Sequence, residues 1–275
     1  MFVSSLFVST LLATAAFAIP TSKERHDARL ARRAGGLRSS HPKITNATHV
    51  EYSSNWAGAV YNSAAGTYKS VTATFTVPTP KEPSGASGSH AASAWVGIDG
   101  DSCDNAILQT GVDFTVSGSS VSYDAWYEWY PDYAYDFSGI SFSPGDSVTL
   151  TVTATSTKAG TAVITNNTKG KTVTKQITSS AALCEQDAEW IVEDFEEGSS
   201  LVPFANFGTV TFTGASAKTG SGSARTAAGA TVGPQAAGED TMDIKQHRRV
   251  LTSVETTDSS VTVTYIGDDA AGMQG

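Results

Sequence analysis

Short runs in which apolar or β-branched residues alternate with polar residues recur along most of this chain. Side chains on a β-strand point alternately to the two faces of a sheet, so a period of two is typical of strands with one buried face. A helix needs apolar residues three or four apart, and residues 181–190 have room for one such turn at most. The clearest alternating runs are 71–78, 147–156, 171–178, 209–214 and 260–267.

Turn-forming residues separate these runs and indicate the fold class. Ser143-Pro144-Gly145-Asp146 and Asn166-Asn167 combine the residues that tight turns prefer. Many short strands with turn signals between them are typical of an antiparallel sandwich or barrel. Residues 50–266 have the length of one large all-β domain. Within it, 79–93 and 214–241 are rich in Gly, Ser, Ala and Pro and are predicted to be loops.

The ends of the chain differ from this domain. Residues 1–18 are apolar and end in Ala16-Phe17-Ala18, the small-x-small pattern of a signal peptidase site, so we expect a secreted, extracellular protein. Residues 19–49 hold seven of the 18 Lys and Arg but only two of the 27 Asp and Glu, and their Arg32-Arg33 pair is typical of a processing site. We interpret 19–49 as a basic propeptide; the alternative is a disordered basic arm. Residues 267–275 are predicted to be a loose tail.

The charge of the remaining chain restricts its partners. Without residues 1–49 it has 11 basic and 25 acidic side chains, a net charge of −14. Such a charge disfavours nucleic acid and anionic membranes, and no later stretch is long and apolar enough to span a bilayer. In acid the carboxylates are protonated and few charges remain to repel one another, which suits an acidic medium. We expect a monomer that binds neither nucleic acid nor membranes.

Two cysteines and two sequons indicate covalent modification. An even count of cysteines in a secreted chain favours a Cys103–Cys184 disulfide over a free buried pair. Such a bond would link the segments that carry Gln109 and Glu193. Asn46 and Asn166 each begin an Asn-x-Thr sequon and are candidate glycan sites.

Four strand-like segments place acids, an amide and large aromatic side chains on the face opposite their apolar residues. The apolar set is Ala94, Val96, Ile98, Ala106, Leu108, Val112, Phe114, Tyr123, Ala125, Tyr127, Trp129, Trp190 and Val192. The opposite set includes Trp95, Asp99, Gln109, Asp113, Asp124, Trp126, Glu128, Tyr130, Glu189 and Glu193. A solvated sheet face normally mixes charge signs, whereas this one has no Lys or Arg, so we interpret it as functional. Asp194 falls on the apolar side and indicates a bulge or a buried hydrogen bond.

Familiar catalytic motifs are missing. There is no Gly-x-Ser-x-Gly, no His-Glu-x-x-His and no Asp-Thr-Gly, and His90 and His247 fall in predicted loop regions. Asp99-Gly100-Asp101 lacks the rest of a calcium loop and is predicted to be a turn. We therefore expect neither a metal ion nor a cofactor.

Carboxylate chemistry remains. A glutamate can act as a general base in acid because its reference pKa is about 4.3, and neighbouring acids raise that pKa by repulsion. An amide such as Gln109 can donate a hydrogen bond to a developing oxyanion without titrating. Glu193 and Gln109 could together activate a water molecule and stabilise a tetrahedral intermediate.

Several longer segments resemble a known family. These are 52–58 (YSSNWAG), 95–103 (WVGIDGDSC), 107–113 (ILQTGVD), 123–131 (YDAWYEWYP) and 189–197 (EWIVEDFEE). In consistent order over roughly residues 50–213, they resemble the glutamic peptidases, or eqolisins, of fungi.

The resemblance implies a concanavalin-like sandwich of two antiparallel sheets, secretion as a proenzyme, and pepstatin-insensitive endopeptidase activity in acid. Glu193 would deprotonate the attacking water and then protonate the leaving amine, while Gln109 would hold the oxyanion. Cys103 and Cys184 match a family disulfide. Expected partners are polypeptide substrates and the chain's own propeptide as an inhibitor. Eight residues of this chain match family positions around the substrate-binding cleft: Trp56, Trp95, Asp99, Asp113, Asp124, Trp126, Glu128 and Tyr130.

One other class of protein fits the same surface. In a secreted carbohydrate-active sandwich, either a glycosidase or a lectin, Trp95 and Trp126 could stack on sugar. Glu128 and Glu193 could then form an acid pair. This alternative explains the acids and aromatics but leaves Gln109 without a necessary role.

Overall fold

The computed structural model describes residues 50–103, 105–197, 200–220, 222, 224–226 and 239–268. The predicted signal peptide, the predicted propeptide with its Arg32-Arg33 pair and the sequon at Asn46 lie outside these residues. The described part of the chain forms strands, turns and bends but no helix. A membrane-spanning helix is accordingly not found among these residues. The single helical turn considered for 181–190 is not formed, because a strand begins at Asp187.

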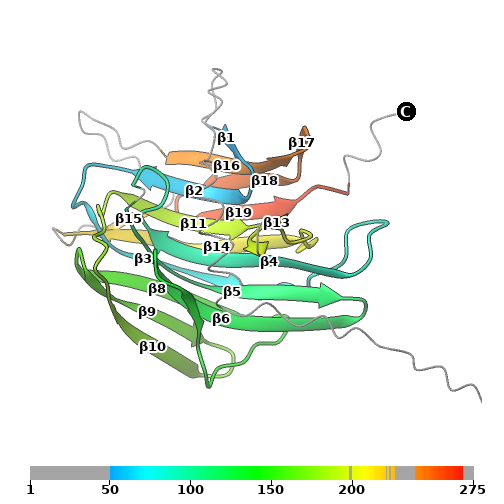
Figure 1. The fold of residues 1–275 in the computed structure, drawn as a ribbon, viewed down its shortest axis with the longest axis horizontal. Helices are drawn as coiled ribbons and strands as arrows, with labels where there is room; N and C mark the ends of the chain where they lie inside the picture. The colour runs from blue at the N-terminus through cyan, green and yellow to red at the C-terminus, as the bar shows by residue number, and fades with distance from the viewer. Residues whose placement is uncertain are drawn as a thin grey trace, which may run out of the picture.

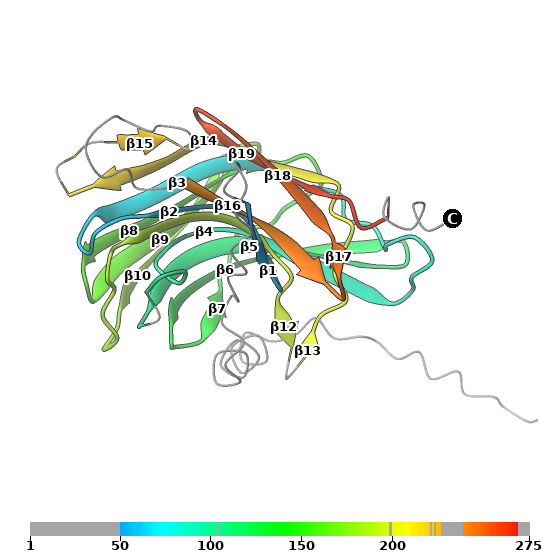
Figure 2. The same cartoon turned by 90° about the horizontal axis from the view of Figure 1, so that it is seen from above.

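Most strands belong to two sheets, stacked as two layers (Figures 1 and 2). The nine-stranded sheet contains β1 (Val50–Ser53), β16 (Glu239–Gln246), β2 (Trp56–Asn62), β11 (Asp187–Glu193), β4 (Ser89–Ile98), β5 (Ile107–Ser117), β6 (Ser120–Tyr130) and β7 (Ala134–Asp136) in that order, with β17 (Arg249–Val250) beside β16. The eight-stranded sheet contains β10 (Lys171–Thr178), β9 (Ala159–Asn166), β8 (Ser147–Ser156), β3 (Tyr68–Thr76), β14 (Thr209–Thr219), β19 (Ser260–Tyr265) and β18 (Thr252–Thr257), with β15 (Ala224–Thr226) beside β14. A separate hairpin joins β12 (Glu196–Glu197) to β13 (Ser200–Leu201).

Neighbouring strands run antiparallel throughout, except for the parallel pair β1 and β16. Segments far apart in the chain meet in the nine-stranded sheet: β16 lies against β2, and β11 lies between β2 and β4 (Figure 1). This architecture confirms the predicted sandwich of two antiparallel sheets.

The main core lies between the two sheets and consists of the alternate residues that the sequence predicts. All 13 apolar residues named above for the four segments belong to this core or pack against it. On the opposite face of the eight-stranded sheet, threonine pairs such as Thr72–Thr151 and Thr74–Thr149 are hydrogen-bonded across strands at 2.7 Å. β-Branched residues suit such a pleated, half-solvated surface. The nine-stranded sheet is different, because its second face is also buried.

Two predicted loops are partly strand. Residues 79–93 include the start of β4 at Ser89, and 214–241 include the end of β14, all of β15 and the start of β16. The prediction was wrong in these places because it took their small residues as a sign of loops. Ala92, Ala215 and Ala217 are buried in the core between the two sheets, and Ala91 is buried in a separate small cluster with Phe195 and Val202. The short β9 was likewise not singled out, although Ala162 and Ile164 alternate into the core.

The chain remains fixed beyond β19, where a loose tail was expected from Gly267 onward. Asp268 accepts hydrogen bonds from the Ser84 amide at 2.9 Å and from Asn206 Nδ2 at 2.7 Å. The Arg249 guanidinium donates to the Gly267 carbonyl. Residues 267 and 268 therefore belong to the folded domain, and 269–275 lie outside the described residues.

Asn166 does not carry a glycan in this fold. Its side chain is fully buried, and its Nδ2 donates to the Ser141 carbonyl at 3.0 Å and to Asp146 Oδ2 at 2.8 Å. Both hydrogens of the amide nitrogen that a glycan would modify are therefore in use inside the protein.

Candidate active site

Strand register gathers the predicted residues into three rows on the outer face of the nine-stranded sheet, the face turned away from the main core. The first row contains Trp56, Glu193, Ser93, Asp113 and Asp124. The second row contains Gly58, Ile191, Trp95, Gly111 and Trp126. The third row contains Val60, Glu189, Gly97, Gln109 and Glu128. The predicted dyad thus occupies β11 and β5, on either side of β4.

Glu193 is held by two neutral donors. Asn55 Nδ2 lies 3.2 Å from its Oε1, and Trp95 Nε1 lies 2.9 Å from its Oε2. Hydrogen bonds of this kind stabilise an ionised carboxylate and fix its orientation. Each carboxylate oxygen has two acceptor positions, and the Asn55 and Trp95 donors each occupy one of them. Glu193 is 2% exposed.

Gln109 is oriented by Glu128, its register partner on β6. Gln109 Nε2 donates to Glu128 Oε2 at 2.6 Å, and both residues are buried. An amide nitrogen carries two hydrogens, so one remains for another acceptor. Gln109 Oε1 is buried and has no hydrogen-bond partner among the described residues. Buried polar atoms are seldom left unpaired, so this amide is prepared for a ligand.

The Trp95 indole connects the two members of the predicted dyad. Its Nε1 donates to Glu193, and its Cζ3 lies over Gly97, the register partner of Gln109. A Cβ placed on Gly97 would be 2.8 Å from Trp95 Cζ3 and 3.4 Å from Gln109 Cβ. Only a residue without a side chain leaves room for the ring at this position.

A second apolar cluster, smaller than the main core, lies on the outer face of the nine-stranded sheet. Trp95 and Trp126 are fully buried in it together with Ile191 and Met242, and Trp56 packs at its edge. The Trp56 and Trp95 rings meet edge to face with centroids 5.0 Å apart. Trp56 Nε1 is buried without a hydrogen-bond partner among the described residues.

Acidic residues surround the dyad at close spacing. Asp113 and Asp124 are directly opposite each other on β5 and β6, and Asp113 is buried. Glu189 is fully buried two strands from Gln109 in the third row. Tyr130 is half-buried at the end of β6, two residues beyond Glu128. Like charges directly across a sheet repel each other.

Asp99 does not share the environment of the dyad, although the sequence placed it in the same cleft. It adopts a left-handed backbone conformation with φ of 67°. Its Oδ2 accepts from the Glu185 amide at 2.8 Å, and its Oδ1 accepts from the Gln186 and Asp187 amides at 2.8 and 3.2 Å. Burial, partly offset by these hydrogen bonds, raises the pKa of Asp99 to about 6. Its carboxylate thus organises the chain that enters β11.

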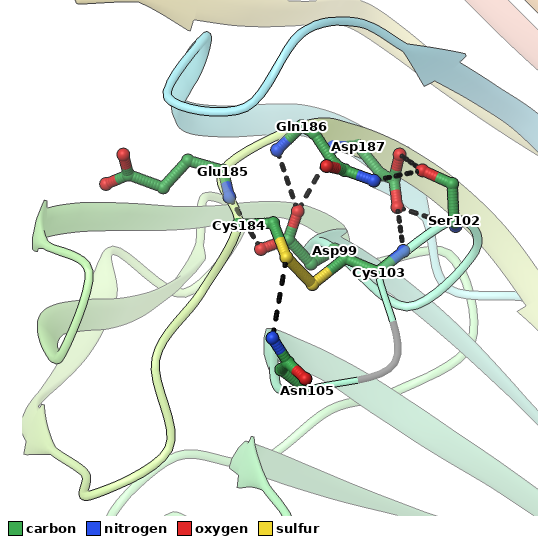
Figure 3. The surroundings of a disulfide bond; sticks show 8 residues. All are labelled: Asp99, Ser102, Cys103, Asn105, Cys184, Glu185, Gln186 and Asp187. Carbon is green, nitrogen blue, oxygen red and sulfur yellow. Dashed lines mark hydrogen bonds between the residues drawn. A yellow bond between two sulfur atoms is a disulfide. The ribbon is translucent and has the colours of Figure 1, made fainter.

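The predicted disulfide forms beside Asp99, with Cα atoms of Cys103 and Cys184 6.1 Å apart (Figure 3). Asp187 completes this end of the sheet by accepting hydrogen bonds from the Ser102 amide, the Ser102 hydroxyl and the Cys103 amide (Figure 3). Asp99 and the two cysteine sulfurs are the group of potential metal ligands found in the described chain. Because the sulfurs are bonded to each other, they are not available as thiolates.

Two contributors to the site, Asn55 and Ser93, were not singled out from the sequence. Asn55 lies outside any strand and offers no periodic signal. Ser93 shares the parity of Trp95 and accepts a hydrogen bond from Trp126 Nε1 at 3.2 Å, so alternation could have found it. Asp194 follows the last residue of β11 and accepts a 2.7 Å hydrogen bond from Gln246, which confirms the buried hydrogen bond considered for it.

The protein is a two-sheet all-β sandwich with a carboxylate and an amide held on a buried, acidic sheet face, the kinds of group that a carboxylate hydrolase uses. Residues 54–265 match the Peptidase A4 family. The chain is 48% identical over 292 aligned residues to aspergillopepsin-2 from Aspergillus niger, covering 96% of this chain and 99% of that protein. It is 44% identical to scytalidopepsin B from Scytalidium lignicola over 75% of this chain and 80% of the relative. The protein belongs to the Peptidase A4, or eqolisin, family and is a glutamic-type endopeptidase.

Solved structures agree with this assignment. Scytalido-glutamic peptidase with a peptide-based transition state analog superimposes with a TM-score of 0.66 at 39% identity, over 78% of this chain and 98% of that one. Aspergilloglutamic peptidase from Aspergillus niger gives 0.58 at 55% identity, over 64% of this chain and 99% of that one. The alternative of a carbohydrate-active sandwich is wrong, because these relatives are peptidases.

Proposed function

We propose that this chain is a secreted acid endopeptidase in which Glu193 and Gln109 form the catalytic dyad. The observation that carries the proposal is the directed geometry of these two side chains on one buried face. Glu193 is fixed by Asn55 and Trp95, and Gln109 is fixed by Glu128, which leaves the second Nε2 hydrogen of Gln109 for another acceptor.

Peptide hydrolysis follows from these positions. The Glu193 carboxylate takes a proton from a water molecule while the water oxygen attacks the scissile carbonyl carbon. The electron pair of the carbonyl bond moves to oxygen, and the second Nε2 hydrogen of Gln109 stabilises that oxyanion. The tetrahedral intermediate collapses, the C–N bond breaks, and Glu193 returns its proton to the departing nitrogen. Glu193 is then ionised again for the next turnover.

The surrounding residues supply binding and acid dependence. Trp56 is half-buried against Trp95 and Trp126 and offers apolar surface for substrate side chains, while the half-buried Asp124 and Tyr130, backed by the buried Asp113 and Glu128, offer polar groups for a peptide backbone. As pH rises, repulsion among these acids and with acidic substrates increases. We therefore assign fast cleavage to acidic pH and slow cleavage to neutrality.

The test is a pair of conservative substitutions with matched controls. Glu193→Gln and Gln109→Ala should each lower kcat on denatured protein at acidic pH by at least about 10²–10³-fold, the typical cost of losing one oxyanion donor. Glu255→Gln on β18 and Gln176→Ala on β10 remove the same groups from exposed positions and should leave kcat unchanged. Wild-type turnover by a folded Glu193→Gln or Gln109→Ala variant would refute the dyad. Pepstatin and chelators should have little effect.

The proposal extends to processing. Residues 1–18 would direct secretion, and 19–49 would act as an inhibitory propeptide whose net charge of +5 opposes the −14 of the remaining chain. Ionised acids such as Asp124 and Glu128 could attract Lys23, Arg25 and the Arg32-Arg33 pair near neutrality, and protonation in acid would release them. A synthetic 19–49 peptide should inhibit the mature enzyme more strongly toward neutral pH and less strongly in high salt. Absence of inhibition would leave the segment a passive role in export or folding.

A further inference from the structure

Gln246 joins two segments that flank the proposed general base. It is the last residue of β16 and is half-buried. Its Nε2 donates to Asp194 Oδ2 at 2.7 Å and to the Ser54 carbonyl at 2.9 Å, so both amide hydrogens are in use. Asp194 directly follows Glu193, and Ser54 directly precedes Asn55, the residue that donates to Glu193.

The segment around Asn55 is held from three directions. The Ser53 hydroxyl oxygen accepts from the Asn55 and Trp56 amides at 3.2 and 3.1 Å, which closes a tight turn between β1 and β2. The Asp194 amide donates to the Asn55 carbonyl at 2.8 Å. Gln246 supplies the third contact, through Ser54. With these restraints, Asn55 Nδ2 is placed 3.2 Å from Glu193 Oε1.

The backbone beyond Gln246 adopts a costly conformation that fixes this position. Gln246 pairs with Arg249 across a two-residue hairpin loop, in which His247 and Arg248 have φ of 47° and 69°. Such loops favour Asn-Gly, because a residue with a Cβ is disfavoured in the left-handed region. Strained backbone of this kind is retained mainly where surrounding structure and function require it.

We propose that Gln246 is a positioning residue for hydrolysis, which acts through Asn55 and Asp194 to hold the Glu193 carboxylate in its reactive orientation. This inference rests on the proposed function, because it takes Glu193 as the general base. Gln246 lies on neither β11 nor the Asn55 turn, so β16 contributes to the dyad by this side chain rather than by the strand pairing alone.

The experiment compares Gln246→Leu with Gln186→Leu. Gln186 is a matched control because its Nε2 also donates a short hydrogen bond, to Ser102 Oγ at 2.6 Å, but at the opposite end of β11. Steady-state kinetics on a peptide substrate and thermal melting are measured at the same acidic pH. Gln246→Leu should lower kcat about tenfold with KM changed less than twofold, whereas Gln186→Leu should leave kcat within twofold of wild type.

A double-mutant cycle separates positioning from general loosening. If Gln246 acts through Asn55, Gln246→Leu should lower kcat less than about threefold when Asn55 is already alanine, because contacts in one network are not additive. A full tenfold loss in the Asn55→Ala background and again in an Asp194→Ala background would overturn the proposal, because neither contact would then carry the effect. So would a wild-type kcat in folded Gln246→Leu, or losses of kcat in both glutamine variants that follow their melting temperatures.

Two further variants keep the result decisive. If Gln246→Leu does not fold, Gln246→Glu keeps the size of the side chain and, when protonated, donates one hydrogen bond in place of two; its kcat should fall between those of wild type and Asn55→Ala. A wild-type kcat in Gln246→Glu would count against the proposal. Glu193→Gln distinguishes failure of the proposed function from failure of this inference. If Glu193→Gln is active, the proposed dyad is wrong. If Glu193→Gln is inactive but Gln246→Leu is unaffected, only the positioning role of Gln246 is wrong.

Discussion

Among the acids of the outer face, Glu193 is distinguished by two neutral donors that come from outside its own strand. Asn55 arrives from the turn before β2 and Trp95 arrives from β4. Neither of these two donors brings a charge. A neutral donor lowers the basicity of a carboxylate less than a cation does, so the two contacts orient Glu193 and leave it able to take a proton from water.

Trp95→Phe tests the contribution of one of these two hydrogen bonds to Glu193. Phenylalanine retains an aromatic ring over Gly97 but removes the Nε1 donor to Glu193. A hydrogen bond to a charged group contributes about 1.5–3 kcal/mol, so kcat/KM should fall about 10–100-fold. Trp129→Phe is the control, because Trp129 Nε1 donates at 3.1 Å to the Ala181 carbonyl on the core side of the same sheet. Equal loss of activity in the two variants, after correction for unfolded protein, would contradict a specific role for the Trp95 donor.

The residues that could be predicted from the sequence are those whose direction follows from strand alternation. Gln109, Asp113, Glu128 and Glu193 lie on the outer face because each is an odd number of residues from a core residue in an uninterrupted strand. Asp99 could not be placed in this way, since its left-handed φ ends the alternation just after β4. Asn55 and Gln246 lie at the ends of strands, where tertiary contacts rather than periodicity decide direction.

At the scale of elements, β4 and β5 form a platform for the indoles because glycines leave room beneath the rings. Gly97 on β4 and Gly111 on β5 lie beneath Trp95 and Trp126. The predicted loops at 79–93 and 214–241 failed for a related reason. A segment rich in small residues is predicted to be a loop, but small residues are also found in strands where sheets pack closely.

Gly111→Ala should disturb both function and stability. A Cβ at this position would lie 2.6 Å from the Ala94 carbonyl oxygen, 2.6 Å from Trp95 Cβ and 2.8 Å from Trp126 Cζ2. Overpacking of this kind costs about 1–3 kcal/mol in the free energy of unfolding, and the displaced Trp95 should lower kcat as well. Gly220→Ala is the control, since its Cβ would meet Lys69 Cε at an ordinary 3.5 Å. Urea unfolding measures the free energy of unfolding, and peptide kinetics measure kcat. If Gly111→Ala changes neither quantity, the residues around Gly111 can shift to accept a Cβ, and the packing argument is wrong.

At the scale of the whole molecule, several buried carboxylates favour the folded state in acid. Burial raises the pKa of Asp99 and of Asp243 to about 6, against hydrogen bonds that lower it. Burial also raises the pKa of Asp187, again against hydrogen bonds from its neighbours. A group whose folded pKa is above its unfolded value near 3.8 contributes stability below that value and loses it as pH rises through the folded pKa. The domain should therefore be more stable near pH 4 than near neutrality, which matches the acidic activity assigned to the dyad.

Asp99→Asn tests this pH dependence with little change of shape. Asparagine tolerates the left-handed conformation at this position, and it cannot titrate. The Asp99 shift, from 3.8 to about 6, corresponds to at most about 3 kcal/mol of stability lost between pH 4 and pH 7. The melting temperature of wild type should fall over that interval. The melting temperature of Asp99→Asn should fall less steeply, because asparagine does not titrate. Its absolute value can be lower at every pH, because one acceptor to the 185–187 amides becomes a donor. Asp258→Asn, exposed between β18 and β19, should keep the wild-type slope. An Asp99→Asn slope equal to that of wild type would assign the acid stability to other carboxylates, with Asp243 the next to replace.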